Sequence, residues 1–263
     1  MYLTAENIDD DLQTKYIGRK IIYFDTIDST NAYAKRIGET CEEGTVITCE
    51  KQEMGRGRLG RQWESQKGSL CMTIVLRPNI NISHVSKITQ VCAAAVSEAL
   101  NEYGIEVQIK WPNDLKLGNK KICGILTEMK TENNNLLFVA IGIGLNVYNV
   151  FEESPEDIKK VATSIFVETG KKLNRSSLAA RIMNNFEYLY EEFINGNFNV
   201  SLDICKKKSD VIGKPINLIN NKTVKKAKAI DLGSDGELVV QYENGKIDSI
   251  ISGEISIRTI EDR

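Results

Sequence analysis

The chain has 263 residues, of which 41% are hydrophobic and 27% charged, a composition that is typical of a folded globular protein and excludes a disordered one. Lys and Arg number 34 against 36 Asp and Glu, and the net charge of -2 argues against a general electrostatic attraction to nucleic acid. A single histidine and six cysteines without a C-x-x-C pair argue against a histidine triad, a zinc cluster or a disulfide framework.

The amino-terminal half combines short strands with helices. Residues 1–11 lack the basic and apolar regions of a signal peptide, and no apolar run approaches the roughly 18 residues of a membrane span, so we expect a soluble, cytoplasmic protein that does not bind a membrane. Capping residues and apolar periodicity predict helices at residues 4–13, 32–37 and 85–103. Alternating and apolar runs predict strands at residues 20–24, 45–49, 69–76 and 105–110.

The second half begins with strands that follow one another directly. Residues 122–130 and 136–146 flank a polar turn and follow the hairpin signal Gly118-Asn119, which predicts antiparallel pairing. Helices are expected at 163–169 and 175–196. Residues 212–257 hold short strand-like runs between turns, as in a small β-barrel of about 50 residues. We therefore divide the chain into an N-terminal helical segment or linker at 1–19, a main domain at 20–210 and a small domain at 211–263.

The loop at residues 55–61 contains three glycines and three arginines, which suits neither a helix nor a strand. Glycine loses much freedom on ordering and neighbouring arginines repel one another, so we expect the loop to be mobile without a ligand. Guanidinium groups and backbone amides fit phosphate or carboxylate oxygens, which favours an anionic small molecule. A solvated loop or a nucleic-acid arm explains this stretch alone about equally well.

A second motif, KWPNDL, occupies residues 110–115. Pro112 lacks an N–H and holds Trp111 extended, so the preceding strand ends there and exposes Asn113 and Asp114. A plain turn would leave Lys110 and Trp111 unexplained. Polar residues without a simple structural role gather at the ends of the predicted strands, where binding sites tend to form. They are Ser29, Thr30, Gln52, Arg56, Arg58, Arg61, Asn113, Asp114, Lys121 and Asn146.

Six blocks resemble, in order, the motifs of biotin protein ligases: residues 25–31 (DTIDSTN), 55–63 (GRGRLGRQW), 110–115 (KWPNDL), 120–126 (KKICGIL), 142–146 (GIGLN) and 252–258 (SGEISIR). The resemblance implies an α+β fold. Its catalytic domain, at 20–210, would be a mixed, largely antiparallel sheet with helices packed on it, similar to class II aminoacyl-tRNA synthetases, and 211–263 would be an SH3-like β-barrel.

The activity that the resemblance implies is an ATP-dependent ligation. Biotin's carboxylate attacks the α-phosphorus of ATP to give biotinyl-5'-AMP and pyrophosphate, and a lysine of a biotin carboxyl carrier protein, part of acetyl-CoA or pyruvate carboxylase, then attacks the mixed anhydride. Both nucleophiles belong to substrates, which fits a chain without a triad. By motif position, Arg58 and Lys121 would contact the biotin carboxylate and adenylate phosphate, and Gly55, Arg56 and Arg61 would bind from the same loop.

The resemblance also assigns the remaining site residues. Ser29, Thr30 and Gln52 would hydrogen-bond the ureido ring of biotin, which is costly to bury unpaired. Gly124 and Gly142 would let the backbone approach biotin, although packing between strands explains them nearly as well.

The adenine end would involve Asn113 and Asn146, and Arg258 would reach back from the terminal barrel towards the nucleotide. Asp114 would orient or deprotonate the attacking lysine, or alternatively help to hold Mg²⁺, which is expected with ATP. No metal-binding side chain is otherwise assigned.

Other readings stay open. A lipoate or octanoate ligase would have a related fold, although GRGRLGRQW and KWPNDL argue against it, and a non-catalytic sensor of biotinyl-5'-AMP would share the site. Some biotin ligases carry an additional DNA-binding domain of roughly 60 residues. Residues 1–19 are too few for one, so we expect no DNA binding from this chain, whether it is naturally short or lacks a removed domain. Pairing of sheet edges makes a homodimer plausible.

Overall fold

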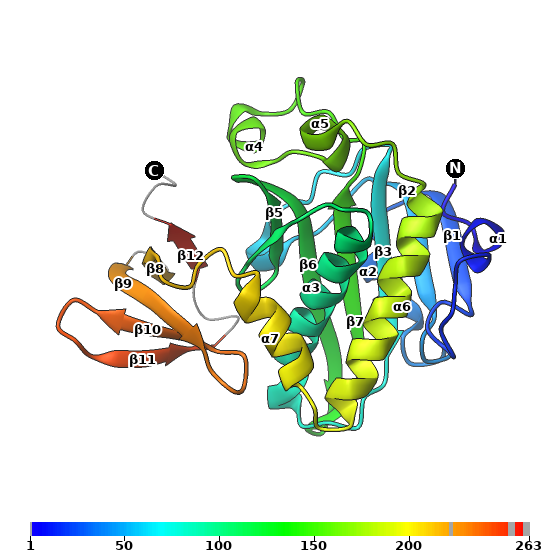
Figure 1. The fold of residues 1–263 in the computed structure, drawn as a ribbon. Helices are drawn as coiled ribbons and strands as arrows, with labels where there is room; N and C mark the ends of the chain where they lie inside the picture. Colours follow the sequence, from blue (N-terminus) through cyan, green and yellow to red (C-terminus); the bar gives the residue numbers. More distant parts are fainter. Residues whose placement is uncertain (1, 221–222, 252–255, 260–263) are drawn as a thin grey trace.

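A seven-stranded sheet forms the centre of the molecule (Figure 1). The computed structural model describes residues 2–220, 223–251 and 256–259. The strand order is β1-β2-β3-β7-β6-β5-β4. The pair β1–β2 is parallel and the other neighbours are antiparallel, which confirms the mixed, largely antiparallel sheet. The bounds are β1 Ile21–Ile27, β2 Val46–Gln52, β3 Ser69–Leu76, β4 Gln108–Lys110, β5 Asp114–Leu117, β6 Lys120–Glu132 and β7 Asn135–Asn146.

Helices cover both faces of this sheet. α3 (Val85–Glu102) and α6 (Arg175–Ile194) lie side by side over the face seen in Figure 1, and α2 (Thr30–Ile37) covers the other. Successive strand residues face opposite sides, so Ile74 joins the core under α3 and α6 while Val75 packs with α2. The shorter helices are α1 (Ala5–Asp9), α4 (Glu156–Val161), α5 (Ile165–Thr169) and α7 (Asn199–Lys207), with 3₁₀ turns η1 (Arg58–Gly60) and η2 (Ile82–His84).

A second sheet follows α7 and contains five antiparallel strands in the order β11-β10-β9-β8-β12. They are β8 (Pro215–Asn220), β9 (Thr223–Leu232), β10 (Leu238–Tyr242), β11 (Ile247–Ile250) and β12 (Ser256–Thr259). This small antiparallel sheet beside the mixed sheet confirms the α+β class. In the part of the chain that the structure describes, no helix combines the length and apolarity needed to cross a bilayer.

Several elements differ from the sequence-based expectation. The strand expected at residues 105–110 is confined to Gln108–Lys110, and α4 and α7 were not predicted. α4 had a visible signal, since Pro155 is its N-cap and Glu156 and Asp157 lie in its first turn. The polar turn between β6 and β7 narrows to Asn133 and Asn134, both with positive φ, as a tight hairpin requires.

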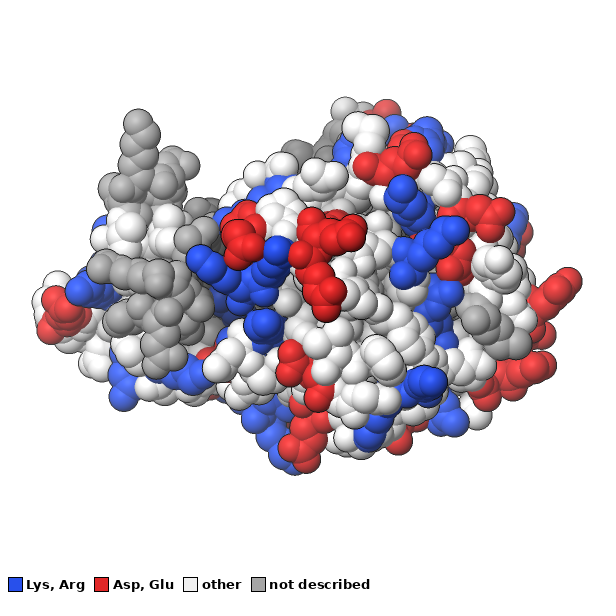
Figure 2. Space-filling model, turned by 90° about the horizontal axis from the view of Figure 1, so that it is seen from above, with Lys and Arg blue, Asp and Glu red and all other residues white. Residues whose placement is uncertain are grey.

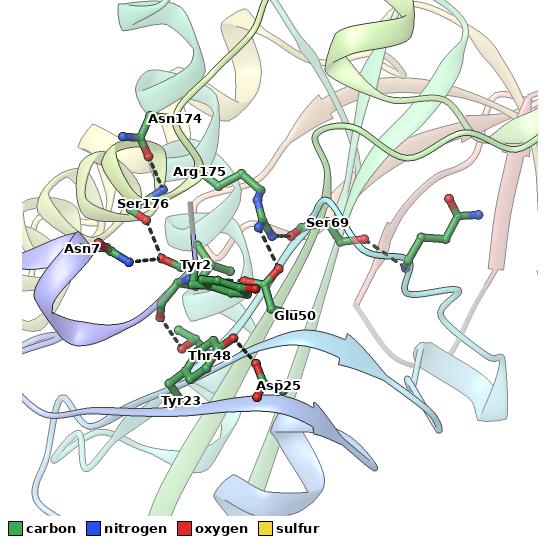
Figure 3. Close-up of polar contacts among 12 residues, drawn as sticks. Tyr2, Asn7, Tyr23, Asp25, Thr48, Glu50, Ser69, Asn174, Arg175 and Ser176 are labelled. Atoms are coloured by element: carbon green, nitrogen blue, oxygen red, sulfur yellow. Dashed lines mark hydrogen bonds and ion pairs between the residues drawn. The ribbon is translucent and has the colours of Figure 1, made fainter.

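The N-terminal segment is joined to the main sheet through a buried ion pair (Figure 3). Arg175, at the start of α6, lies 2.7 Å from the Glu50 carboxylate on β2, and both side chains are 9% exposed. Arg175 also donates to the carbonyl of Ser69. Leu3 donates its N–H to Glu50 and accepts a hydrogen bond from the hydroxyl of Thr48. β2, β3, α6 and residue 3 therefore meet at this ion pair.

We predict that Glu50→Leu lowers the free energy of unfolding by about 3–5 kcal/mol, because it leaves the Arg175 charge buried without its carboxylate. The double variant Glu50→Leu/Arg175→Met should recover much of this loss. Urea unfolding measures both. Arg181–Glu102 is the matched exposed pair, with side chains 45% and 39% exposed, and Arg181→Met should cost less than about 1 kcal/mol. Equal losses in the buried and exposed pairs would contradict the prediction.

Candidate functional site

A cleft that is open to solvent lies where the start of α2, the end of β2 and the loop at residues 55–61 meet strands β6 and β7. Its lining combines hydroxyl and amide groups, three cations and four glycines. The lining residues are Ser29, Thr30, Asn31, Gln52, Arg56, Gly57, Arg58, Trp63, Asn113, Lys121, Gly124, Ile125, Leu126, Gly142, Ile143 and Gly144.

The start of α2 supplies a preorganised set of hydrogen-bonding groups. Ser29 is the N-cap, and its hydroxyl accepts from the N–H of Ala32. Thr30 donates both its N–H and its hydroxyl to Oε1 of Gln52, at 2.9 and 3.1 Å. These bonds occupy the Gln52 oxygen, so the amide NH₂ is the part of Gln52 suited to donate to a ligand carbonyl. Ser29 therefore caps the helix, while the hydroxyl of Thr30 orients Gln52.

Asn31 fixes this end of the cleft to the sheet. Its amide donates to the carbonyl of Leu126 and to Glu128, each at 3.1 Å, and its oxygen accepts from Thr73 at 2.7 Å. A Cβ at position 142 would overlap this amide, so Gly142 is needed for the contact. Asn31 was not singled out from the sequence, although it closes the DTIDSTN block.

Trp63 lines the same cleft and lies against β6 and β7. A Cβ at position 144 would lie 2.5 Å from Cε2 of Trp63, and one at position 124 would lie 3.0 Å from its Cζ3. Gly124 and Gly144 thus give the indole room to lie close to the backbone of β6 and β7. The alternative considered for Gly124 and Gly142 was packing between strands. In the structure the neighbours of these two glycines are the side chains of Trp63, Lys121 and Asn31.

The arginine loop is folded over the KWPNDL motif. Nη1 of Arg58 donates to Oδ1 of Asn113 at 2.8 Å, and Asn113 is itself held by two hydrogen bonds with Ile125. Burial lowers the pKa of the Arg58 guanidinium from its ordinary value, a change that Asp114 opposes and Arg61 reinforces. Arg58 is thus a partly desolvated cation whose charge an anionic ligand would stabilise.

Lys121 forms the other cationic wall. Its Nζ lies 2.6 Å from the carboxylate of Asp114 and 5.4 Å from the ring centre of Trp63. The backbone of Lys121 pairs with Ala162 and accepts from the N–H of Thr163. Residues 162–163 are therefore adjacent to Lys121, at the edge of the cleft.

The structure brings together most of the predicted site residues and places the others around them. Asn146 is 2% exposed and donates to the carbonyl of Thr163. The N–H of Thr163 in turn donates to the carbonyl of Lys121. Gly55 is buried against the carbonyl of Trp63, and Arg61 is exposed at the end of η1. Arg258 lies in β12 opposite Asn217, and its side chain is outside the described residues.

The positive charge of the cleft is a local feature. Arg56, Arg58 and Lys121 line it, whereas Lys and Arg alternate with Asp and Glu across the face shown in Figure 2. Among the described residues, no group of three or more His, Cys, Asp and Glu is placed to hold a metal ion. Asp114, which lies beside the cleft, is paired with Lys121 and could contribute at most one carboxylate to a Mg²⁺ bound by phosphates.

Comparisons with known proteins show which family the chain resembles. The model of the Biotin/lipoate A/B protein ligase family matches residues 23–146, and that of the Biotin protein ligase C terminal domain matches residues 211–258. Bifunctional ligase/repressor BirA of Bacillus subtilis is 32% identical over 249 residues, 94% of this chain and 76% of that protein. BirA of Escherichia coli is 30% identical, over 93% and 76%.

A solved structure shows the same fold. Biotin protein ligase from Aquifex aeolicus, in complex with biotin and ATP, has a TM-score of 0.79 and 30% identity, covering 92% of this chain and 99% of that one.

We predict that Gly144→Ala displaces Trp63, because the new methyl group would overlap the indole. Tryptophan emission should shift to longer wavelength as the ring moves towards solvent. Gly57→Ala is the control, since its Cβ would meet its nearest neighbour at 3.4 Å, an ordinary contact. An unshifted spectrum in Gly144→Ala would contradict the close approach of Trp63 to β7.

Proposed function

The chain belongs to the Biotin/lipoate A/B protein ligase family, and because its relatives include biotin protein ligases we propose that it joins biotin to a carrier protein in two steps. Biotin is first activated with ATP as biotinyl-5'-AMP, and the biotinyl group then passes to a lysine of a biotin carboxyl carrier domain. The observation that carries the proposal is the division of the cleft into a neutral hydrogen-bonding end and a cationic end. Such a cleft fits a ligand with a polar, uncharged head and an anionic tail.

The neutral end suits the ureido ring of biotin. Thr30 holds the oxygen of Gln52, which turns the Gln52 amide into a fixed donor, and Ser29 lies beside it at the N-terminus of α2. A ureido carbonyl accepts hydrogen bonds and its two N–H groups donate, so burying it requires partners of both kinds. Hydroxyls can serve as either, and this gives Ser29 and Thr30 their role in the proposal.

The cationic end suits the reacting groups. In the first step a carboxylate oxygen of biotin forms a bond to the α-phosphorus, and the bond to pyrophosphate breaks. Negative charge on these oxygens is stabilised by Arg58 and Lys121, with Arg56 and the exposed Arg61 in the same loop. Gly55 is part of the fold of this loop, since a side chain there would strike the carbonyl of Trp63.

In the second step the carrier lysine attacks the acyl carbon, the acyl–phosphate bond breaks, and AMP leaves. The lysine must lose a proton, and its reference pKa of about 10.4 keeps it mostly charged at neutral pH. Asp114 is the carboxylate beside the cleft that can orient or accept from this amine. Asp114 is paired with Lys121, so phosphate binding by Lys121 and amine orientation by Asp114 are linked. When the phosphate attracts Lys121, the Asp114 carboxylate is released to interact with the amine.

The nucleotide end is assigned to Asn113, Asn146 and Arg258. Asn113 already contacts Arg58, and Asn146 supports residues 162–165 through Thr163, so both lie at the edge of the cationic wall. Mg²⁺ would arrive with the phosphates of ATP, since the described side chains offer it no complete set of oxygen donors.

The proposal also covers the setting of the enzyme. Residues 20–210 would be the catalytic domain and 211–263 the small terminal domain, supported by the two sheets and by the separate family match at 211–258, with 1–19 as an N-terminal segment. We place the protein in the cytoplasm, with a homodimer formed through exposed sheet edges. DNA binding is not assigned to these residues.

The deciding experiment incubates the protein with biotin, ATP and a biotin carboxyl carrier domain and detects the product with streptavidin. The control carrier has its acceptor lysine changed to arginine. Labelling of the first carrier alone supports the proposal. Lipoate replacing biotin as the activated acid would favour a lipoate ligase, and formation of biotinyl-5'-AMP without labelling would favour a sensor of this intermediate.

We predict that Arg58→Gly speeds release of biotinyl-5'-AMP by about 10–100-fold, the loss expected for a hydrogen bond to a charged group. Stability should change by less than about 1 kcal/mol, because the residue lies in a loop. Stopped-flow release and urea unfolding measure the two effects. Arg61→Gly, at an exposed position of the same loop, should have the smaller effect on release. An unchanged release rate in Arg58→Gly would refute this role.

Lys121→Ala should slow formation of biotinyl-5'-AMP by about 100-fold, the size of effect expected when one preorganised charge is removed from a reacting phosphate. Transfer from preformed biotinyl-5'-AMP should be slowed less. Quenched-flow assays of each step separate them. Lys120→Ala is the control, because neighbouring residues of a strand point to opposite faces and Lys120 does not line the cleft. A defect confined to transfer would contradict the assignment.

A further inference from the structure

The turn between β9 and β10 contacts the main domain through the backbone carbonyl of Gly236 and the side chain of Asp235. The oxygen of Gly236 accepts two buried hydrogen bonds, from Nε2 of Gln90 on α3 at 2.6 Å and from Nε1 of Trp111 at 2.8 Å. The turn is closed internally by Gly236 N–H to Gly233 O, and Lys87 on α3 pairs with Asp235 at 2.7 Å. Trp111 and Gln90 are each 4% exposed, so water does not compete for these bonds while the turn is docked.

Trp111 is continuous with the residues that shape the cationic end of the cleft. Two positions further along, Asn113 accepts from Arg58 and exchanges two hydrogen bonds with Ile125. The next residue, Asp114, pairs with Lys121. A change in the position of the Trp111 ring therefore moves the backbone that carries the partners of both cations.

The rest of the terminal sheet is attached elsewhere. Asp210 is 2% exposed and pairs with Lys116 and Lys214, at 2.8 and 2.7 Å. The backbone of Ile109 pairs with that of Lys208 and Asp210 at the end of α7, and Lys206 pairs with Asp231. These attachments do not involve Gly236. The contact at Gly236 is therefore not needed to join the two domains.

We infer that the carbonyl of Gly236 is a positioning group for the adenylation site: the terminal sheet, through Trp111, sets the geometry of the Asn113–Arg58 and Asp114–Lys121 pairs. The inference rests on the proposed function for its catalytic consequence. The positioning itself is a property of the fold. Gly236 and Gln90 touch no part of the cleft and act only through Trp111.

The test uses two glycines of the same sheet that share a backbone strain. Gly236 has φ of +79°, and a Cβ there would lie 2.5 Å from Nε2 of Gln90. Gly245 has φ of +81°, and its Cβ would meet nothing within 4 Å. Gly236→Ala and Gly245→Ala therefore impose a similar conformational cost, but only the first displaces Gln90, which shares the Gly236 carbonyl with Trp111.

Amide hydrogen exchange of residues 110–126, measured without substrates, is the first readout. We expect exchange about tenfold faster in Gly236→Ala than in Gly245→Ala, because Ile125 loses its fixed partner Asn113. In adenylation assays, kcat should fall about tenfold in Gly236→Ala, with KM for biotin changed less than about twofold since the neutral end of the cleft is distant from Trp111. Trp111→Phe, which removes the indole N–H and keeps a ring, should reproduce both effects and serves if Gly236→Ala does not fold.

Equal exchange of residues 110–126 in Gly236→Ala and Gly245→Ala overturns the inference. So does an equal loss of kcat in the two variants, or a loss of kcat in Gly236→Ala accompanied by an equal rise in KM for biotin. The exchange measurement requires no activity. A wild-type protein that forms no biotinyl-5'-AMP would refute the proposed function, while faster exchange in Gly236→Ala would still support the positioning.

Discussion

The close approach of two side chains to the backbone of β6 and β7 is the constraint on which the site depends. Asn31 occupies the space above Gly142, and Trp63 occupies that above Gly144 and Gly124. The face of a sheet is normally covered by side chains. At Gly124, Gly142 and Gly144 there is no Cβ atom, so neighbouring groups can approach the backbone of the sheet. The cleft lies in this region, with Asn31 at one end and Trp63 at the other. The register of β7 with β3 and β6 therefore determines the position of the cleft.

The two ends of the cleft differ in how firmly they are held. The neutral end is built from α2, β2 and β3, and the hydroxyl of Thr73 contacts both Thr30 and Asn31. The cationic end is built from the loop at residues 55–61 and from Lys121 on β6, and its cations are held by the hydrogen bond from Arg58 to Asn113 and the ion pair between Lys121 and Asp114. A ligand can thus be recognised by a rigid region before its charge organises the more adaptable one.

Local patterns in the sequence predicted most strands of the sheet, the antiparallel pairing of residues 122–130 with 136–146 and most polar residues of the cleft. Ser29, Gln52 and Asn113 lie at strand or helix ends, where proline, capping groups and alternation mark a boundary that short-range reasoning can find. Asn31 and Gly144 could not be found in this way, since their importance comes from contacts with residues far along the chain. The role of Gly236 depends on the docking of one sheet against another, for which the local sequence contains only a turn signal. The side-chain roles at the nucleotide end stay predictions.

The ion pair between Asp114 and Lys121 has a consequence for how the site is emptied. In the proposed reaction the phosphate of the intermediate competes with Asp114 for the Lys121 ammonium, so part of the attraction to the nucleotide is offset by the pair that is given up. After acyl transfer the phosphate of AMP carries more negative charge than that of the intermediate, and Asp114 still offsets part of the attraction between AMP and Lys121. A built-in competitor of this kind weakens product retention without weakening recognition of biotin, and it allows a site rich in positive charge to turn over.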